Sequence, residues 1–242
     1  MAELLVFRRR EQKYLLDAAQ TAAFRSAMEE HMEPDAYATS DIRNIYYDTP
    51  DYRIIRRSLE KPVYKEKLRL RAYGDVTPES KVFLEMKKKY QGIVYKRRIR
   101  LRLRKAVDYM ADPAALLDGG QIHREIDYFK QFYKELRPAM YLSYDRCSWC
   151  SRDKTLRITM DRNILYRTEE LDLTAPKYGR QLLSEGQTLV EIKAPGAIPL
   201  WLVRFLSDHK IRQISISKYG TAYGTLLSEH KIESRGFRYD HV

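Results

Sequence analysis

Segments in which every second residue is charged constrain the fold of this chain more than any other feature. Successive side chains of a strand point to opposite faces of a sheet, so each such segment has one charged face and one apolar face. The pattern predicts eight strands. They are expected at residues 4–14, 41–48, 63–74, 81–90, 93–103, 138–150, 154–161 and 188–194.

Helical segments are predicted between these strands, and prolines stand at several of the joints, where residues that break regular structure belong. The helices are expected at residues 15–31, 106–117, 121–136, 199–208 and 216–230. The chain shows no repeat, no low-complexity segment and no linker long enough to divide it. We therefore predict one α+β domain over residues 1–242, with room for a sizeable core.

Basic residues are concentrated on three successive predicted strands. Residues 61–104 hold 15 Lys and Arg against 4 Asp and Glu, and so carry nearly all of the +12 net charge. By alternation, Lys67, Arg69 and Arg71 share one face of a strand, and Lys96 and Arg98 share a face of another. Such a concentration of charge indicates an anionic partner, and nucleic acid, a membrane surface and a small polyphosphate all qualify on charge alone.

Other predicted strands mix carboxylates with cations on one face. Glu11 alternates with Lys13, and Glu191 alternates with Lys193. A closed sheet with a charged interior and helices outside would explain all of these strands and would suit a polyanion together with a metal. An open sheet with one solvated basic face explains the pattern equally well, and for Glu191 with Lys193 it offers a simple cross-strand ion pair.

Several other classes of protein are not expected. No apolar run approaches the roughly 20 residues of a spanning helix, and the first residues do not resemble a signal peptide, so we expect no transmembrane segment and a cytoplasmic location. Cys147 and Cys150 form a lone C-x-x-C, in which a zinc ion would still lack two ligands. The role of the two cysteines stays open, and so does the oligomeric state.

Eight short motifs follow one another in an order that is far more specific than any one of them. They are R-x-E-x-K at 9–13, N-I-Y-Y-D-T-P at 44–50, K-L-R-L-R-A-Y-G at 67–74, F-L-E-M-K-K-K-Y-Q-G-I-V-Y-K-R-R at 83–98, Y-D-R at 144–146, R-I-T-M-D at 157–161, V-E-I-K at 190–193 and S-K-Y at 217–219. From about Phe7 to Leu227, the chain resembles the catalytic domain of the vacuolar transporter chaperone (VTC) polyphosphate polymerases. That domain belongs to the CYTH-like, or triphosphate tunnel metalloenzyme, superfamily.

The resemblance implies an eight-stranded antiparallel β-barrel tunnel with flanking helices, in which cations hold a triphosphate and a carboxylate holds Mn²⁺ or Mg²⁺. By motif position it implies eight phosphate ligands: Lys13, Arg69, Arg71, Lys87, Lys96, Arg146, Arg157 and Lys218. It makes Glu191 the leading metal ligand and lets Glu11 assist. Four further cations are expected to contact substrate: Lys67, Lys89, Arg98 and Lys193. We expect Asp161 to pair with Arg157 rather than to bind the metal.

Three functions are compatible with these residues. The first is a polyphosphate polymerase that transfers the γ-phosphate of ATP or another nucleoside triphosphate to a growing inorganic polyphosphate. The second is a tripolyphosphatase or nucleoside triphosphatase. Many hydrolytic relatives begin with E-x-E-x-K, whereas this chain has Arg9 in place of the first glutamate, which favours transfer over attack by water. The third is a non-catalytic binder of polyphosphate or nucleic acid. Glu85 and Glu191 on the basic faces argue against nucleic acid, and we expect no such partner.

Overall fold

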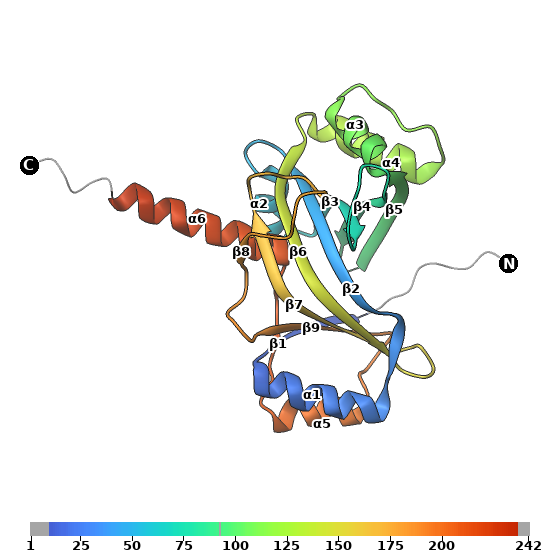
Figure 1. Cartoon of the computed structure of the whole chain (residues 1–242), viewed down its shortest axis with the longest axis vertical. Helices are drawn as coiled ribbons and strands as arrows, with labels where there is room; N and C mark the ends of the chain where they lie inside the picture. Colours follow the sequence, from blue (N-terminus) through green and yellow to red (C-terminus); the bar gives the residue numbers. More distant parts are fainter. Residues whose placement is uncertain (1–9, 92, 237–242) are drawn as a thin grey trace, which may run out of the picture. The chain divides into compact units, whose positions relative to one another are not determined.

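The computed structural model describes residues 10–91 and 93–236 (Figure 1). Over these residues it has ten strands, of which eight correspond one for one to the predicted strands and two, β8 and β10, have only two residues each. The strands are β1 (Arg10–Leu16), β2 (Glu33–Asp48), β3 (Tyr64–Tyr73), β4 (Lys81–Tyr90), β5 (Ile93–Arg102), β6 (Arg137–Cys150), β7 (Arg157–Arg167), β8 (Arg180–Gln181), β9 (Thr188–Ala194) and β10 (Gln213–Ile214).

These strands form one sheet with the order β10-β1-β9-β7-β6-β2-β3-β4-β5, and β8 pairs with β7. The pairs β1·β10, β1·β9, β3·β4, β4·β5, β7·β8 and β7·β9 are all antiparallel. In the described part of the chain, five helices lie between the strands, and a sixth follows β10: α1 (Ala18–His31), α2 (Arg53–Leu59), α3 (Leu103–Ala111), α4 (Gln121–Tyr133), α5 (Leu200–Asp208) and α6 (Lys218–Gly236). The predicted α+β class with a large antiparallel sheet is confirmed.

The chain divides into two compact units, each with its own core. The described part of the first unit comprises residues 10–42, 143–164 and 183–215, and that of the second comprises 43–91, 93–142, 165–182 and 216–236. Strands β2, β6 and β7 contribute residues to both units. The single domain over residues 1–242 stays a prediction, and each unit is described here by itself.

In the first unit, the apolar faces of β1, β7 and β9 pack under helices α1 and α5. Val190 and Ile192 of β9 are each 1% exposed, and they share a core with Phe24 of α1 and Leu202 of α5. The core residues of β9 alternate with the charged residues Glu191 and Lys193 along the same strand. The alternation seen in the sequence therefore separates an apolar face from a charged face in this unit.

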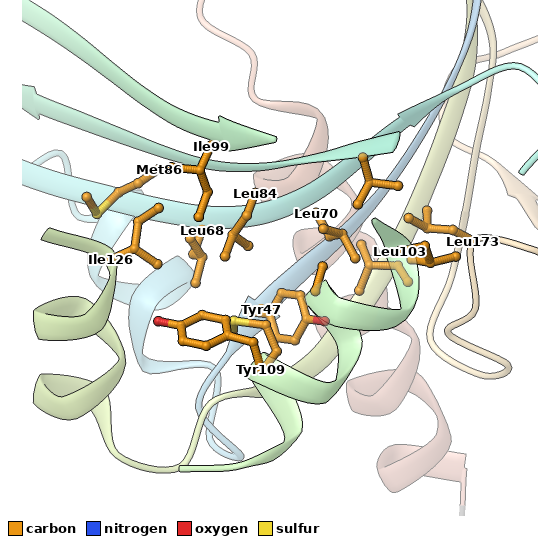
Figure 2. Close-up of a cluster of buried hydrophobic side chains, with 14 of the residues drawn as sticks. Tyr47, Leu68, Leu70, Leu84, Met86, Ile99, Leu103, Tyr109, Ile126 and Leu173 are labelled. Atoms are coloured by element: carbon orange, nitrogen blue, oxygen red, sulfur yellow. The ribbon is translucent and has the colours of Figure 1, made fainter. Parts of the chain in front are cut away.

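In the second unit, β3, β4 and β5 place their apolar side chains against α3 and α4 (Figure 2). Leu68, Leu84 and Met86 have no exposed surface, and they share a core with Ile126 of α4 and Tyr109 of α3. Figure 2 shows these strand residues pointing from the ribbon of the hairpins towards the two helices. The opposite faces of the same three strands carry most of their charged residues, whereas Glu66, Lys88 and Arg97 lie on the side of the helices.

Some helix boundaries differ from the predictions for clear local reasons. Helix α1 begins at Ala18 because Asp17 and Gln20 form a capping box. The Asp17 side chain accepts the backbone N–H of Gln20 at 2.8 Å, and Gln20 Oε1 accepts the backbone N–H of Asp17. Helix α3 ends at Ala111, six residues before the predicted end, because Pro113 disfavours helical geometry at Asp112. Across the described residues, no helix combines the length and the apolar character that a membrane span requires.

Candidate functional site

The charged residues of β3, β4 and β5 form the first candidate surface, which we call the basic face. The register places Arg69 opposite Glu85 and Lys67 opposite Lys87 on β3 and β4, and Lys87 opposite Lys96 on β4 and β5. Every charged residue on this face except Glu85 is a cation. The cations are Lys65, Lys67, Arg69, Arg71, Lys81, Lys87, Lys89, Lys96, Arg98, Arg100 and Arg102.

Glu85 is the counter-anion at the centre of the basic face, and its side chain is only 2% exposed. Arg69 donates to Glu85 Oε2 from Nε at 3.0 Å and from Nη2 at 2.7 Å. Lys96 Nζ lies 2.6 Å from Oε1, and Arg71 Nη1 lies 3.8 Å from Oε2. Burial alone would raise the pKa of Glu85, but Arg69, Lys96 and Arg71 together lower it to about 2. The carboxylate therefore stays ionised at any physiological pH.

Lys96 is a cation on this face whose charge responds to pH near neutrality. Burial lowers the pKa of Lys96 to about 8, although the neighbouring Glu85 raises it, and Arg69 and Arg71 lower it further by repulsion. Arginine side chains remain charged over the same range. The basic face can thus lose positive charge at Lys96 while it keeps the charge of Arg69 and Arg71.

The start of helix α6 lies beside the basic face. Lys67 Nζ donates to Ser217 Oγ at 2.8 Å, and Ser217 Oγ also accepts the backbone N–H of Gly220 at 3.3 Å in the first turn of the helix. Lys218, the first residue of α6, is 8% exposed. The S-K-Y motif therefore brings Lys218 to the same end of the helix that Lys67 contacts.

Asp48 fixes this arrangement from the end of β2. Its carboxylate accepts the backbone N–H groups of Ile54 and Ile55 at the start of α2, at 2.8 and 3.0 Å, and the Tyr219 hydroxyl of α6 at 2.9 Å. Tyr219 in turn stacks on Tyr46, with ring centroids 4.5 Å apart, and Arg69 Nη1 donates to the Tyr46 hydroxyl at 3.2 Å. Residues of the N-I-Y-Y-D-T-P and S-K-Y motifs thus make structural contacts that position Arg69 and Lys218.

A second charged surface lies in the first unit, on β1, β9, β7 and the end of β6; we call it the mixed face. The register pairs Lys13 with Glu191, and Glu11 with Lys193, so acids and bases alternate both along and across the strands. On β7, Arg157 lies opposite Lys193, and Thr159 lies opposite Glu191. This surface largely balances its own charge, because its cations lie beside carboxylates on paired strands, where opposite charges attract each other.

Glu191 is surrounded by cations on the mixed face and is 8% exposed. Its Oε1 lies 3.6 Å from Lys13 Nζ, and its Oε2 accepts Lys193 Nζ at 3.0 Å and lies 3.8 Å from Arg146 Nη2. Glu191 and Lys193 therefore form an ion pair, but the pair lies along β9 and not across two strands as predicted. It forms part of a larger cluster, which also includes Lys13 and Arg146.

The prediction that Asp161 pairs with Arg157 is wrong. Asp161 has no exposed side-chain surface and accepts Arg146 Nε at 2.6 Å and Nη2 at 2.7 Å, as a bidentate pair. Arg157 lies four residues from Asp161 on the same extended strand, about 13 Å away along the backbone, and pairs instead with Asp35 of β2 at 2.8 Å. Asp161 orients Arg146, since both of its oxygens are engaged by one guanidinium.

The mixed face also contains the residues predicted to hold a metal. Among residues 10–91 and 93–236, no group of three or more His, Cys, Asp or Glu is arranged to hold a metal ion. Glu11 and Glu191 nevertheless contact the same ammonium, since Lys13 Nζ lies 3.4 Å from Glu11 Oε1 and 3.6 Å from Glu191 Oε1. Two nearby carboxylates fit Mg²⁺ or Mn²⁺, because such ions take few protein ligands and complete their coordination with phosphate oxygens and water.

All the predicted site residues lie on these two faces or at the start of α6. Unit one holds Glu11, Lys13, Arg146, Arg157, Glu191 and Lys193; unit two holds Lys67, Arg69, Arg71, Lys87, Lys89, Lys96, Arg98 and Lys218. Arg9 lies outside the described residues. The sequence did not single out Tyr46, Asp48 or Ser217 as partners of these residues, and it assigned Asp161 to Arg157 instead of Arg146. Their positions in the motifs were a signal, but their contacts depend on chain segments far apart in sequence.

Comparison with known proteins identifies the family of this chain. The family model of the VTC domain matches residues 8–227, which is most of the chain. The chain belongs to the VTC domain family. A comparison with curated protein sequences found no match for this VTC domain.

Two solved structures share the fold of this VTC domain. A Bacillus halodurans protein assigned as an adenylate cyclase is 14% identical, with a TM-score of 0.55, over 88% of this chain and 94% of that protein. HpAC1 from Hippeastrum, an adenylyl cyclase candidate described as having a dominant triphosphatase activity, is 15% identical, with a TM-score of 0.55, over 89% of this chain and 96% of that protein. The predicted α+β class with a large antiparallel sheet and the family resemblance are both confirmed, whereas the closed eight-stranded tunnel stays a prediction.

Proposed function

We propose that this VTC domain is a polyphosphate polymerase, a metal-dependent phosphotransferase that moves the γ-phosphate of ATP or another nucleoside triphosphate to the end of an inorganic polyphosphate. The observation that carries the proposal is the basic face, on which every charged residue of three paired strands except Glu85 is a cation. A face of this kind favours the binding of anions, because adjacent like charges on paired strands repel each other.

The residues of the basic face suit phosphoryl transfer. The reaction requires neutralisation of the non-bridging phosphate oxygens and in-line placement of donor and acceptor, with little covalent work by the protein. Arg69 is held by Glu85 and Tyr46, so its guanidinium is preorganised to present donors to phosphate oxygens. Lys96, Lys87 and Lys67 add point charges on the neighbouring strands and lower the cost of bringing several phosphates together.

The mixed face supplies the residues for the divalent ion. Glu191 would hold Mg²⁺ or Mn²⁺ with help from Glu11, and the bound ion would neutralise charge on the phosphate oxygens. Lys13 and Arg146 already lie within 4 Å of Glu191 and would bind phosphate oxygens beside it. Asp161 keeps the Arg146 guanidinium in place through its two short hydrogen bonds.

Transfer to polyphosphate is favoured over hydrolysis by one feature of the sequence. A water molecule must be activated by a base or a second metal, whereas the end of a polyphosphate chain is already ionised. Arg9 stands where many hydrolytic relatives carry a glutamate, and therefore removes one carboxylate and adds a cation. The triphosphatase activity stated for HpAC1 supports the hydrolytic alternative, a tripolyphosphatase or nucleoside triphosphatase.

A gel assay separates the candidate functions. The protein is incubated with ATP and Mn²⁺, the products are stained for polymer, and free phosphate and ADP are measured. Long chains with ADP support the polymerase, free phosphate without polymer supports the hydrolase, and the lack of any product leaves only a binding role.

A paired variant tests the assignment of the metal ligand. Glu191→Gln is expected to abolish metal-dependent turnover, because the amide removes the charge that would hold the ion. Glu29→Gln, on the exposed side of α1 in the same unit, is the matched control and should turn over like the wild type. Full activity of Glu191→Gln would exclude Glu191 as the metal ligand.

A further inference from the structure

Two aromatic rings interrupt the charged rows of the basic face. Alternation places Phe83 on the same side of β4 as Glu85 and Lys87, while its neighbours Val82 and Leu84 are completely buried in the core. Tyr73 ends the row of Lys67, Arg69 and Arg71 on β3 and is 44% exposed. The core therefore does not account for these two rings, which lie towards one end of a face whose charged residues are all cations except Glu85.

The two rings form a corner. Their centroids are 6.0 Å apart, and their planes meet at 85°. The Arg71 guanidinium lies 5.2 Å from the centroid of Tyr73, and the Arg98 guanidinium lies 4.9 Å from the centroid of Phe83. A flat heterocycle could stack on one ring and place its edge against the other, with a guanidinium on either side. Aromatic rings and guanidinium planes are the groups on which proteins commonly stack nucleobases.

The corner lies at a suitable distance from the cations that would hold phosphates. Phe83 is two residues from Glu85, the centre of the Arg69, Arg71 and Lys96 cluster, and four residues from Lys87. In a strand these steps correspond to about 7 and about 13 Å. That span matches an extended nucleotide, whose base and terminal phosphate lie on the order of 10 Å apart. One molecule could therefore reach from the corner to the cation rows on the same face.

We propose that Tyr73 and Phe83 form a nucleobase subsite, which stacks the base of a nucleoside triphosphate while its phosphates bind the cations of the basic face. This inference rests on the proposed function and deepens it, since it assigns a binding site to the base of the nucleotide that donates the phosphate. The recognition is by stacking, so it is expected to accept different bases. The competing explanation is that the rings only separate Arg71 from Arg98 and so maintain the basic face.

Binding of two non-hydrolysable ligands distinguishes these explanations. β,γ-Imido ATP carries a base, and diimidotriphosphate carries only the phosphate chain. Dissociation constants for both are measured by calorimetry in the presence of Mn²⁺, with the wild type, Tyr73→Leu and Phe83→Leu. Each variant is expected to bind the ATP analogue about tenfold more weakly and diimidotriphosphate within twofold of the wild type.

Tyr128→Leu is the matched control, because Tyr128 is 65% exposed but lies on α4, away from the basic face. It should leave both dissociation constants unchanged. Equal losses of affinity for the two ligands would show that the rings only maintain the basic face. Unchanged affinity for the ATP analogue would show that the rings bind no base. Either result overturns the nucleobase subsite and leaves the proposed function standing. If the folded wild type binds neither ligand, the proposed function itself fails.

Discussion

The basic face and the mixed face are built from the same alternating pattern but balance their charge in different ways. On the basic face, one buried carboxylate, Glu85, serves Arg69, Arg71 and Lys96. On the mixed face, Glu191 contacts Lys13, Lys193 and Arg146, but Glu11 and Asp161 add further negative charge among the same cations. The first surface has an excess of positive charge, whereas the second is close to neutral.

This difference indicates a division of roles. An excess of cations on paired strands is costly until anions bind, so the basic face is the stronger candidate for the phosphate chain. Carboxylates that already contact side-chain cations can exchange one of these cations for a metal ion at a smaller cost than a face with one buried carboxylate could. The mixed face is therefore the stronger candidate for the divalent ion. Each prediction below changes the charge balance of one face and leaves the other intact.

The largest effect is expected from removing the single carboxylate of the basic face. Glu85→Gln leaves three neighbouring cations without their buried counter-charge and should lower the free energy of unfolding by about 3 kcal/mol. Inorganic tripolyphosphate should restore much of this loss, because its oxygens can replace the carboxylate. Urea denaturation with and without tripolyphosphate measures both effects.

Glu169→Gln is the control for this experiment, since Glu169 is an exposed carboxylate of the same unit. It should change the unfolding free energy by less than about 0.5 kcal/mol. A Glu85→Gln protein that gains no more stability from tripolyphosphate than the wild type would contradict anion binding at the basic face.

A smaller loss is expected on the mixed face from Asp161→Asn. The amide cannot match both donors of Arg146, whose side chain is only 15% exposed, so we expect a loss of about 2 kcal/mol in the unfolding free energy. Other acids remain nearby, and added tripolyphosphate should recover less of this loss than in Glu85→Gln. Asp208→Asn, at the exposed end of α5, is the control. Full rescue of Asp161→Asn by tripolyphosphate would remove the distinction between the faces.

The pH dependence of anion binding should report on Lys96. Because the pKa of Lys96 is about 8, its side chain is mostly charged below pH 8 and loses its positive charge as the pH rises further. Tripolyphosphate should therefore bind more weakly at pH 9 than at pH 7. Lys96→Arg keeps its charge over this pH range. Its loss of affinity for tripolyphosphate between pH 7 and pH 9 should be about three times smaller than that of the wild type. Comparison of the two proteins at each pH cancels the titration of tripolyphosphate itself. Identical pH profiles would exclude Lys96 as the titrating group.

The smallest effect is expected from Glu11→Gln. Its side chain is 26% exposed and contacts Lys13 at 3.4 Å, so the stability should change by less than about 0.5 kcal/mol. If Glu11 assists Glu191, half-maximal turnover should require about threefold more Mn²⁺. A metal titration of activity measures this shift, and an unchanged requirement would restrict the metal site to Glu191.

Most of the fold could be predicted because alternation is a local property. Leu68 and Leu84 lie on core faces, and their charged neighbours lie opposite, so the eight long strands were found from the sequence. Helix α2 was missed because its start is fixed by the carboxylate of Asp48, which lies outside the short seven-residue helix. Strands β8 and β10 have two residues each and leave no periodic signal.

The site was predictable to the level of faces but not of contacts. Period two alone placed Arg69 and Arg71 on one side of β3, and the structure confirms that placement. The partner of Asp161 could not be read from the sequence, because the nearest cation along its own strand face is too far away and Arg146 comes from another strand. The alignment of Glu85 with Arg69 likewise depends on the register of a hairpin, which a shift of one residue would reverse.

The position of Lys13 between Glu11 and Glu191 has a consequence for the order in which the protein is assembled. Small metal-organised domains fold only when the ion binds, because the free energy of metal binding supplies the free energy of folding. Here an ammonium group of the chain itself contacts both carboxylates. If Glu11 and Glu191 hold a metal ion as proposed, folding should not depend on it, and protein prepared in a chelator should be folded.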